Sequence, residues 1–259
     1  MNFSTLQIVF WAAGFIGHAA LLYVLVRKHR WRTFPVFTSL ILFQAIVSVV
    51  LFAMWRYGEK GAYGRAYWTA AVVDFAFQLA LLYEMASIVL RPTGTWVRDA
   101  RNSFLLWSGF AVVVAFGASV AISPPASSTL SKLEVRGVIF TSLLICEIFL
   151  AMIAAANRLG LQWRSHVMAL GQGLTIWAMS ALISDAAHIA LGWDRNFAVL
   201  DYIRYAFYLG ALVLWIVAFW LPERERASLS PDMNNYLVAL HGRVQYDLDR
   251  IAVSKKQLL

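Results

Sequence analysis

Charged residues are scarce in this chain, and cysteine is almost missing. Asp, Glu, Lys and Arg make up 14% of the 259 residues, whereas a soluble domain has about 25%. The one cysteine, Cys146, lies in an apolar run, so a disulfide framework is excluded. The net charge of +8 could suggest a nucleic-acid partner. Its placement beside apolar runs is better explained by a membrane, so we expect no nucleic-acid binding.

Proline and lysine are missing from the interior of the long apolar runs. The six prolines lie at or beyond the ends of these runs, so the chain lacks the proline breaks that many transporters place near mid-membrane. The lysines also lie outside the runs, at Lys28, Lys60, Lys132, Lys255 and Lys256. The motifs of zinc hydrolases, redox CxxC sites, phosphate-binding loops and serine hydrolases are absent too. No enzymatic activity is predicted.

Apolar residues are what the chain has in abundance. They make up 61% of the sequence, and a globule of this size could not bury them all. Lipid is the solvent that accommodates such a surface, and a helical span of the bilayer needs roughly 20 apolar residues. Seven stretches meet this requirement and predict an all-α bundle of seven transmembrane helices: Leu6–Val26, Phe34–Met54, Ala66–Leu90, Phe104–Ile122, Val135–Ala156, Val167–Leu191 and Phe197–Leu221.

The distribution of basic residues predicts the orientation. With seven spans, fifteen Lys and Arg residues fall on the side of the 27–32 loop and the C-terminal tail, and seven fall on the other side. The positive-inside rule places the richer side in the cytoplasm. The N-terminus is therefore expected outside and the C-terminus inside. Tryptophans support the boundaries, because nine of the eleven lie near a predicted interface and two, Trp177 and Trp215, lie deep in spans.

The chain divides into a predicted bundle, residues 1–222, and a cytoplasmic tail, residues 223–259. Within the tail, apolar residues recur at three- and four-residue spacing from Met233 to Ile251, which predicts an amphipathic helix. This helix could lie on the inner leaflet or on the base of the bundle. Alternatively, residues 231–254 could bind a cytoplasmic protein or mediate self-association.

Several ionisable side chains fall inside the predicted spans, where they are costly and usually face a cavity or one another. Helical rise places one group at a similar depth in the outer half. This group predicts an outward-facing ligand pocket formed by Asp74, Gln78, Asp185, His188, Arg204 and Tyr205. The alternative is a purely structural set of interhelical hydrogen bonds and ion pairs, such as one between Arg204 and Asp185 or Asp201.

Two further ionisable residues, His18 and Glu147, lie near the middle of their spans. They could ligate a cofactor or relay protons, or His18 could be a hydrogen-bonded histidine beside the close-packing glycines Gly14 and Gly17. Haem or pigment is an open alternative that the sequence does not favour. On the cytoplasmic side, Glu84 is expected to snorkel or to pair with an arginine, and His166 to be solvated.

The seven-span plan with an outer N-terminus resembles the topology of rhodopsins and other seven-helix receptors over residues 6–221. A retinal protein needs a lysine inside the membrane for the Schiff base. Because no lysine lies in a predicted span, covalently bound retinal is excluded. The resemblance concerns topology alone and is a weak argument for function.

These observations leave three functional hypotheses. The leading one is a sensor or receptor-like protein that binds a small ligand from outside and signals through a cytoplasmic partner. The alternatives are an accessory subunit that holds a cofactor or lipid in a larger membrane complex, and a proton-coupled transporter using His18, Asp74 and Glu147. The short loops and many Ala and Arg residues suggest a bacterial cytoplasmic membrane.

Overall fold

The protein is all-helical over the residues that the structure, a computed structural model, describes: 5–57, 60–90, 98–122, 129–158, 165–191 and 198–223. The chain separates into two units, residues 1–223 and 224–259, and the predicted tail helix lies outside the described residues. The described helices are α1 (Thr5–Arg27), η1 (Arg30–Arg32), α2 (Pro35–Tyr57), α3 (Lys60–Leu90), α4 (Arg98–Ala121), α5 (Thr129–Arg158), α6 (Ser165–Leu191) and α7 (Ala198–Trp220).

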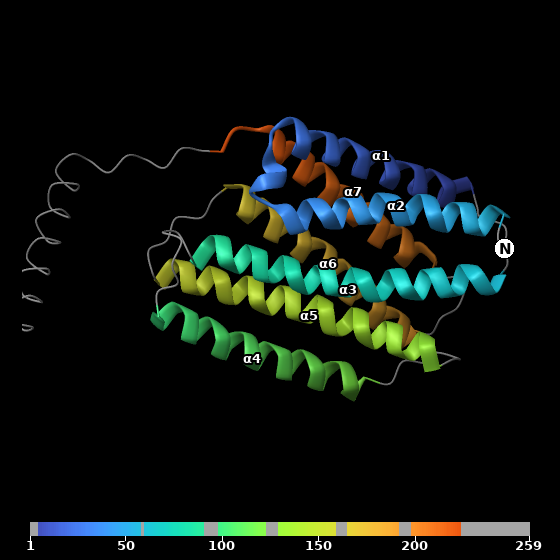
Figure 1. Ribbon diagram of the computed structural model, residues 1–259. Helices are drawn as coiled ribbons and strands as arrows, with labels where there is room; N and C mark the ends of the chain where they lie inside the picture. Colours follow the sequence, from blue (N-terminus) through green and yellow to red (C-terminus); the bar gives the residue numbers. More distant parts are fainter. Residues whose placement is uncertain are drawn as a thin grey trace, which may run out of the picture. The chain divides into compact units, whose positions relative to one another are not determined.

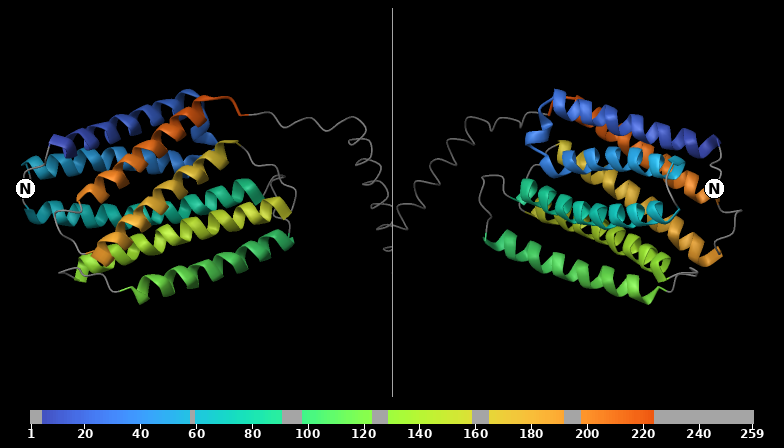
Figure 2. Two further views of the ribbon diagram at one scale, coloured as in Figure 1. Left: turned by 180° about the vertical axis from the view of Figure 1, so that it is seen from behind. Right: turned by 45° about the vertical axis from the view of Figure 1, so that its right-hand side comes forward.

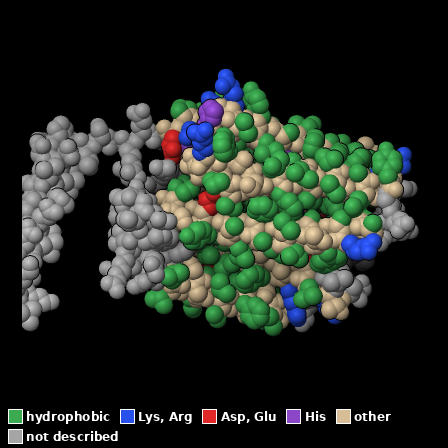
Figure 3. Space-filling view, viewed as in Figure 1, with side chains coloured by type: hydrophobic (Ala, Val, Ile, Leu, Met, Phe, Trp, Pro, Cys, Tyr) green, Lys and Arg blue, Asp and Glu red, His purple; other side chains and the backbone are tan. Residues whose placement is uncertain are grey.

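Each of the seven α-helices coincides with one of the predicted apolar stretches, and no stretch extends more than one residue beyond its helix. A helix satisfies its own backbone hydrogen bonds where water is absent. Six of them, all except α4, are long and apolar enough to cross a membrane. In α4 the apolar segment is shorter, Leu105–Ala121. Figure 3 shows hydrophobic side chains covering the face of the bundle, with Lys and Arg toward the helix ends. These features support an integral membrane protein.

Six helices form a ring, and α4 stands outside it. The neighbouring pairs are α1 with α2, α2 with α3, α3 with α5, α5 with α6, α6 with α7, and α7 with α1. We call α1, α2, α3, α5, α6 and α7 the six-helix ring. α4 packs mainly against α5 and lies at the edge of the bundle in both Figure 1 and Figure 2. Because successive helices alternate in direction, α1 begins and α7 ends at opposite ends of the bundle (Figure 1).

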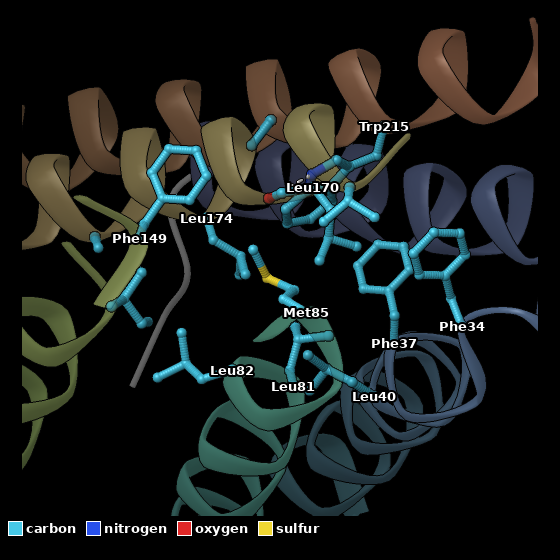
Figure 4. Close-up of a cluster of buried hydrophobic side chains, with 14 of the residues drawn as sticks. Phe34, Phe37, Leu40, Leu81, Leu82, Met85, Phe149, Leu170, Leu174 and Trp215 are labelled. Atoms are coloured by element: carbon cyan, nitrogen blue, oxygen red, sulfur yellow. Dashed lines mark hydrogen bonds between the residues drawn. The ribbon is translucent and has the colours of Figure 1, made fainter. Parts of the chain in front are cut away.

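The half of the ring where α7 ends is tightly packed, and we call it the packed half. Its core includes Phe37, Met85, Leu170 and Trp215 (Figure 4). The Phe37 ring meets the Trp215 ring edge-on at 5.2 Å between centroids. Gly173 lets α7 approach closely, since a Cβ there would collide with the Trp215 indole. Lipid drives helix association only weakly, so close packing of this kind holds the ring together.

The connection from α1 to α2 shows how the packed half is closed. His29 has φ 54°, the left-handed conformation that commonly ends a helix, and α2 begins at Pro35. The Glu84 carboxylate on α3 accepts hydrogen bonds from the backbone N–H groups of Val36 (2.8 Å) and Phe37 (3.1 Å). Glu84 therefore caps α2 and is buried, with 8% of its surface exposed, so the expectation that it snorkels was wrong. The nearby Arg91 lies outside the described residues, so pairing with an arginine stays a prediction.

His166, at the start of α6, is also buried rather than solvated as expected, with 1% of its surface exposed. Its ring stacks on Phe219, with 5.3 Å between centroids. Nε2 lies 3.3 Å from the carbonyl oxygen of Leu221, and Nδ1 lies 3.6 Å from the Glu223 carboxylate. His166 thus ties the beginning of α6 to the end of α7.

Candidate functional site

A cavity of about 690 Å³ lies in the half of the ring where α1 begins, which we call the cavity half. All six ring helices line it, and each contributes residues from the same end of the bundle. The segments are 8–18 of α1, 43–55 of α2, 63–78 of α3, 134–141 of α5, 177–185 of α6 and 201–209 of α7. Ligand pockets typically have volumes of about 300–1,000 Å³, so the cavity is large enough for a small molecule.

Five of the six residues predicted for a ligand pocket line this cavity: Asp74, Gln78, Asp185, Arg204 and Tyr205. They come from α3, α6 and α7, which the depth estimate had placed at one level. The sixth, His188, lies outside the described lining. It is buried one turn further along α6, with Nε2 3.3 Å from the Asp201 carboxylate. Ligand binding by these residues remains a prediction.

Asp74 is held by two glutamine side chains. Gln44 Nε2 on α2 donates to Oδ1, and Gln78 Nε2, one turn along α3, donates to Oδ2 at 2.6 Å. Both donors are uncharged, so they orient the carboxylate without neutralising it. A carboxylate can accept about four hydrogen bonds, so Asp74 keeps acceptor capacity for a ligand.

Asp185 and Arg204 connect α6 to α7. Arg204 Nη1 lies 3.6 Å from Asp185 Oδ1, which is the ion pair that the structural alternative predicts. Asp185 is only 4% exposed, and its Oδ2 has no hydrogen-bond partner among the described residues. Gln78 Oε1 is likewise buried and without a described partner. Buried acceptors without a hydrogen bond are costly. The ion pair between Arg204 and Asp185 therefore does not satisfy all the buried polar groups of this site.

Another carboxyl group in the lining, Glu134, was missed by sequence reasoning. It accepts a hydrogen bond from the Tyr67 hydroxyl on α3. The predicted fifth span began at Val135, one residue after Glu134, whereas α5 begins at Thr129. Gln44 stood inside a predicted span, but nothing in the sequence indicated that it faces Asp74.

Aromatic rings form much of the remaining wall. Trp11 lies 4.4 Å from Phe52 and 6.1 Å from Phe15 between centroids, and both pairs are stacked. Trp11 Nε1 donates to the Ser48 carbonyl at 3.3 Å, which fixes the indole between α1 and α2. Tyr63 and Tyr67 also line the cavity. The cavity therefore combines carboxyl groups with aromatic faces.

His18 and Glu147 occupy different places in the bundle. His18 lines the cavity, and its Nε2 lies 2.5 Å from the Tyr208 hydroxyl. Glu147 lies outside the described lining, six residues beyond Thr141 on α5 and thus about 9 Å deeper by helical rise. A proton relay joining the two residues is therefore not supported by a described contact.

Among the described residues, no cluster of three or more His, Cys, Asp or Glu side chains could hold a metal ion. Comparisons with protein-family models, curated proteins and solved structures found no match. The geometry of the cavity is therefore the basis for any functional proposal.

Proposed function

We propose that the protein is a seven-helix membrane sensor or receptor-like protein that binds a small ligand in the cavity and signals through a cytoplasmic partner. The observation that carries the proposal is the cavity itself, which gathers Asp74, Gln78, Asp185, Arg204 and Tyr205 from three helices. In this proposal α4 is the seventh span, the cavity half faces outward, and the membrane is a bacterial cytoplasmic membrane. The excess of Lys and Arg at the other end supports that orientation.

α7 offers a route by which a bound ligand could affect the cytoplasmic side. Its first half lines the cavity through Arg204, Tyr205 and Tyr208, and its second half places Trp215 and Phe219 in the packed core. A ligand that shifts the first half must also alter the packing of the second, because tightly packed cores resist continuous deformation.

The experiment that tests the proposal is a search for a bound molecule in the purified full-length protein. Extracts of the wild type and of two leucine variants are compared by mass spectrometry. Gly14→Leu adds a side chain at a glycine that lines the cavity. Gly117→Leu is the control, because it adds the same side chain on the exposed side of α4, away from the cavity. An added Cβ meets nothing within 4 Å at either position. We expect a small molecule to copurify with wild type and Gly117→Leu and to be depleted in Gly14→Leu. Equal recovery from all three proteins would contradict the proposal.

A second candidate function is an accessory subunit of a membrane complex, and α4 is the feature that favours it. This helix lies outside the ring and exposes Leu106, Phe110 and Val113 at three- and four-residue spacing. Such an apolar face could be covered by another membrane protein instead of lipid. Migration of the protein in a larger complex after mild solubilisation, lost in Phe110→Ala but kept in Ile16→Ala on the exposed side of α1, would favour this candidate.

A further inference from the structure

The cavity contains far more negative than positive groups. Among the described residues, its lining includes four carboxyl side chains, Asp74, Glu134, Asp185 and Asp201, and one arginine, Arg204. Asp185 is the partner of Arg204. The described hydrogen bonds to Asp74 and Glu134 come from uncharged amide and hydroxyl groups. A positively charged ligand would be attracted to this site, and an anion would be repelled from it.

Two unpartnered oxygen atoms in the lining point to the same chemistry. Asp185 Oδ2 and Gln78 Oε1 are both buried without a described hydrogen-bond partner, and each residue is only 4% exposed. Both atoms are acceptors. A ligand that donates hydrogen bonds would satisfy them and remove the cost of leaving them unpaired.

The aromatic wall supplies a third, independent argument. Trp11 stacks on Phe52, which in turn meets Trp55 at a tilt, so three rings adjoin along α1 and α2 in the lining. Tyr63 and Tyr67 stack on each other on α3. Aromatic faces attract cations, most strongly where water is excluded. The same rings provide apolar area for the hydrocarbon part of a ligand.

We propose that the cavity binds a protonated organic amine, with its ammonium group near Asp74, Gln78 and Asp185 and its hydrocarbon part against the Trp11–Phe52 wall. This inference rests on the proposed ligand-binding function and specifies the class of ligand. Ammonium N–H groups supply both the charge and the donors that the site lacks. A quaternary ammonium would satisfy the charge but not the open acceptors.

The test uses three probes that share a phenyl ring and differ in charge: 2-phenylethylamine, 2-phenylethanol and phenylacetate. Each is added to the purified full-length protein, and binding is measured by calorimetry and by the shift in the thermal unfolding midpoint. We expect the protonated amine to bind and to raise the midpoint, and the alcohol and the anion to have at least tenfold weaker effects. Sodium chloride is tested as a further probe, because it supplies an inorganic cation, Na⁺.

Variants assign the binding to the named groups. Asp74→Asn and Asp185→Asn should each weaken amine binding tenfold or more, because each removes a carboxylate from the cavity. Glu147→Gln is the matched control, because it alters a carboxyl group in the same bundle but outside the described lining, and it should bind the amine like the wild type. Arg204→Gln should bind the amine more tightly, because it removes the positive charge of the lining and frees Asp185 Oδ1. This gain in affinity keeps the test decisive if an aspartate variant fails to fold.

The outcomes separate this inference from the proposed function. Binding of phenylacetate that is lost in Arg204→Gln would overturn the amine assignment and leave the cavity as a ligand site for anions. Stabilisation by sodium equal to that by the amine would overturn it in favour of an inorganic cation. If no probe binds at millimolar concentration, the amine assignment is wrong. If Gly14→Leu also leaves the copurifying molecules unchanged, the proposed function fails with it.

Discussion

Removing the Glu84 side chain should destabilise the bundle by uncapping α2. The carboxylate accepts hydrogen bonds from the N–H groups of Val36 and Phe37, and Glu84 is only 8% exposed. In Glu84→Ala both N–H groups lose their acceptor in a region that water enters poorly. A buried donor left unsatisfied costs about 1–3 kcal/mol, and loss of an N-cap typically costs about 1 kcal/mol. For the two N–H groups together, we expect the free energy of unfolding to fall by about 2–4 kcal/mol.

Glu84→Gln should lie between the wild type and Glu84→Ala, because the amide oxygen can still accept one bond while its NH₂ group faces the second N–H. The free energy of unfolding is measured by denaturant titration of the purified protein in detergent. Glu147→Gln is the matched control. Its Oε2 has no hydrogen-bond partner among the described residues, so removing this charge should be neutral or stabilising. If Glu84→Gln and Glu147→Gln had equal stability, the capping role of Glu84 would be refuted.

Two further predictions concern contacts between helices. In a double-mutant cycle of Asp185→Asn and Arg204→Gln, we expect a coupling energy of roughly 1 kcal/mol, typical of polar contacts between membrane helices; a coupling near zero would show that the 3.6 Å pair is not stabilising. Gly173→Ala should cost about 1–3 kcal/mol in unfolding free energy, because its Cβ would collide with the Trp215 indole. Gly210→Ala on α7 meets nothing within 4 Å and should be neutral or slightly stabilising; equal effects would contradict the close packing described for Gly173.

The helices could be predicted from the sequence because their cause is local. A run of about 20 apolar residues is sufficient to indicate a membrane helix. Each of the seven predicted stretches matches an observed α-helix, and none extends more than one residue beyond either end of its helix. The ends were less accurate, since polar residues at a membrane surface can continue a helix. α3 begins at Lys60 and α5 at Thr129, each six residues before the predicted span.

The depth of a residue in the membrane could also be predicted, but the direction in which its side chain points could not. Helical rise placed Asp74, Asp185 and Arg204 at a similar depth, because depth depends only on position within a span, and the three residues do line one cavity. Which side of a helix faces the interior depends on its neighbours, so the pairing of Gln44 with Asp74 could not be foreseen. The same limitation explains Glu84, whose partners lie on α2, and His166, whose partners lie at the end of α7 and just beyond it.

The contrast between the two halves of the ring bears on the choice between sensor and transporter. A substrate leaving the cavity toward the other end would have to pass the contact of Phe37 with Trp215 and the stacking of Phe37 on Phe219, whose centroids are 5.5 Å apart. Opening that path requires α2 and α7 to separate, and Gly173 and Leu170 on α6 hold Trp215 in place. A sensor needs a much smaller change, because a shift of α7 at Arg204 is carried to Trp215 along one rigid helix. A ligand that alters Trp215 fluorescence without crossing the membrane would therefore favour the sensor.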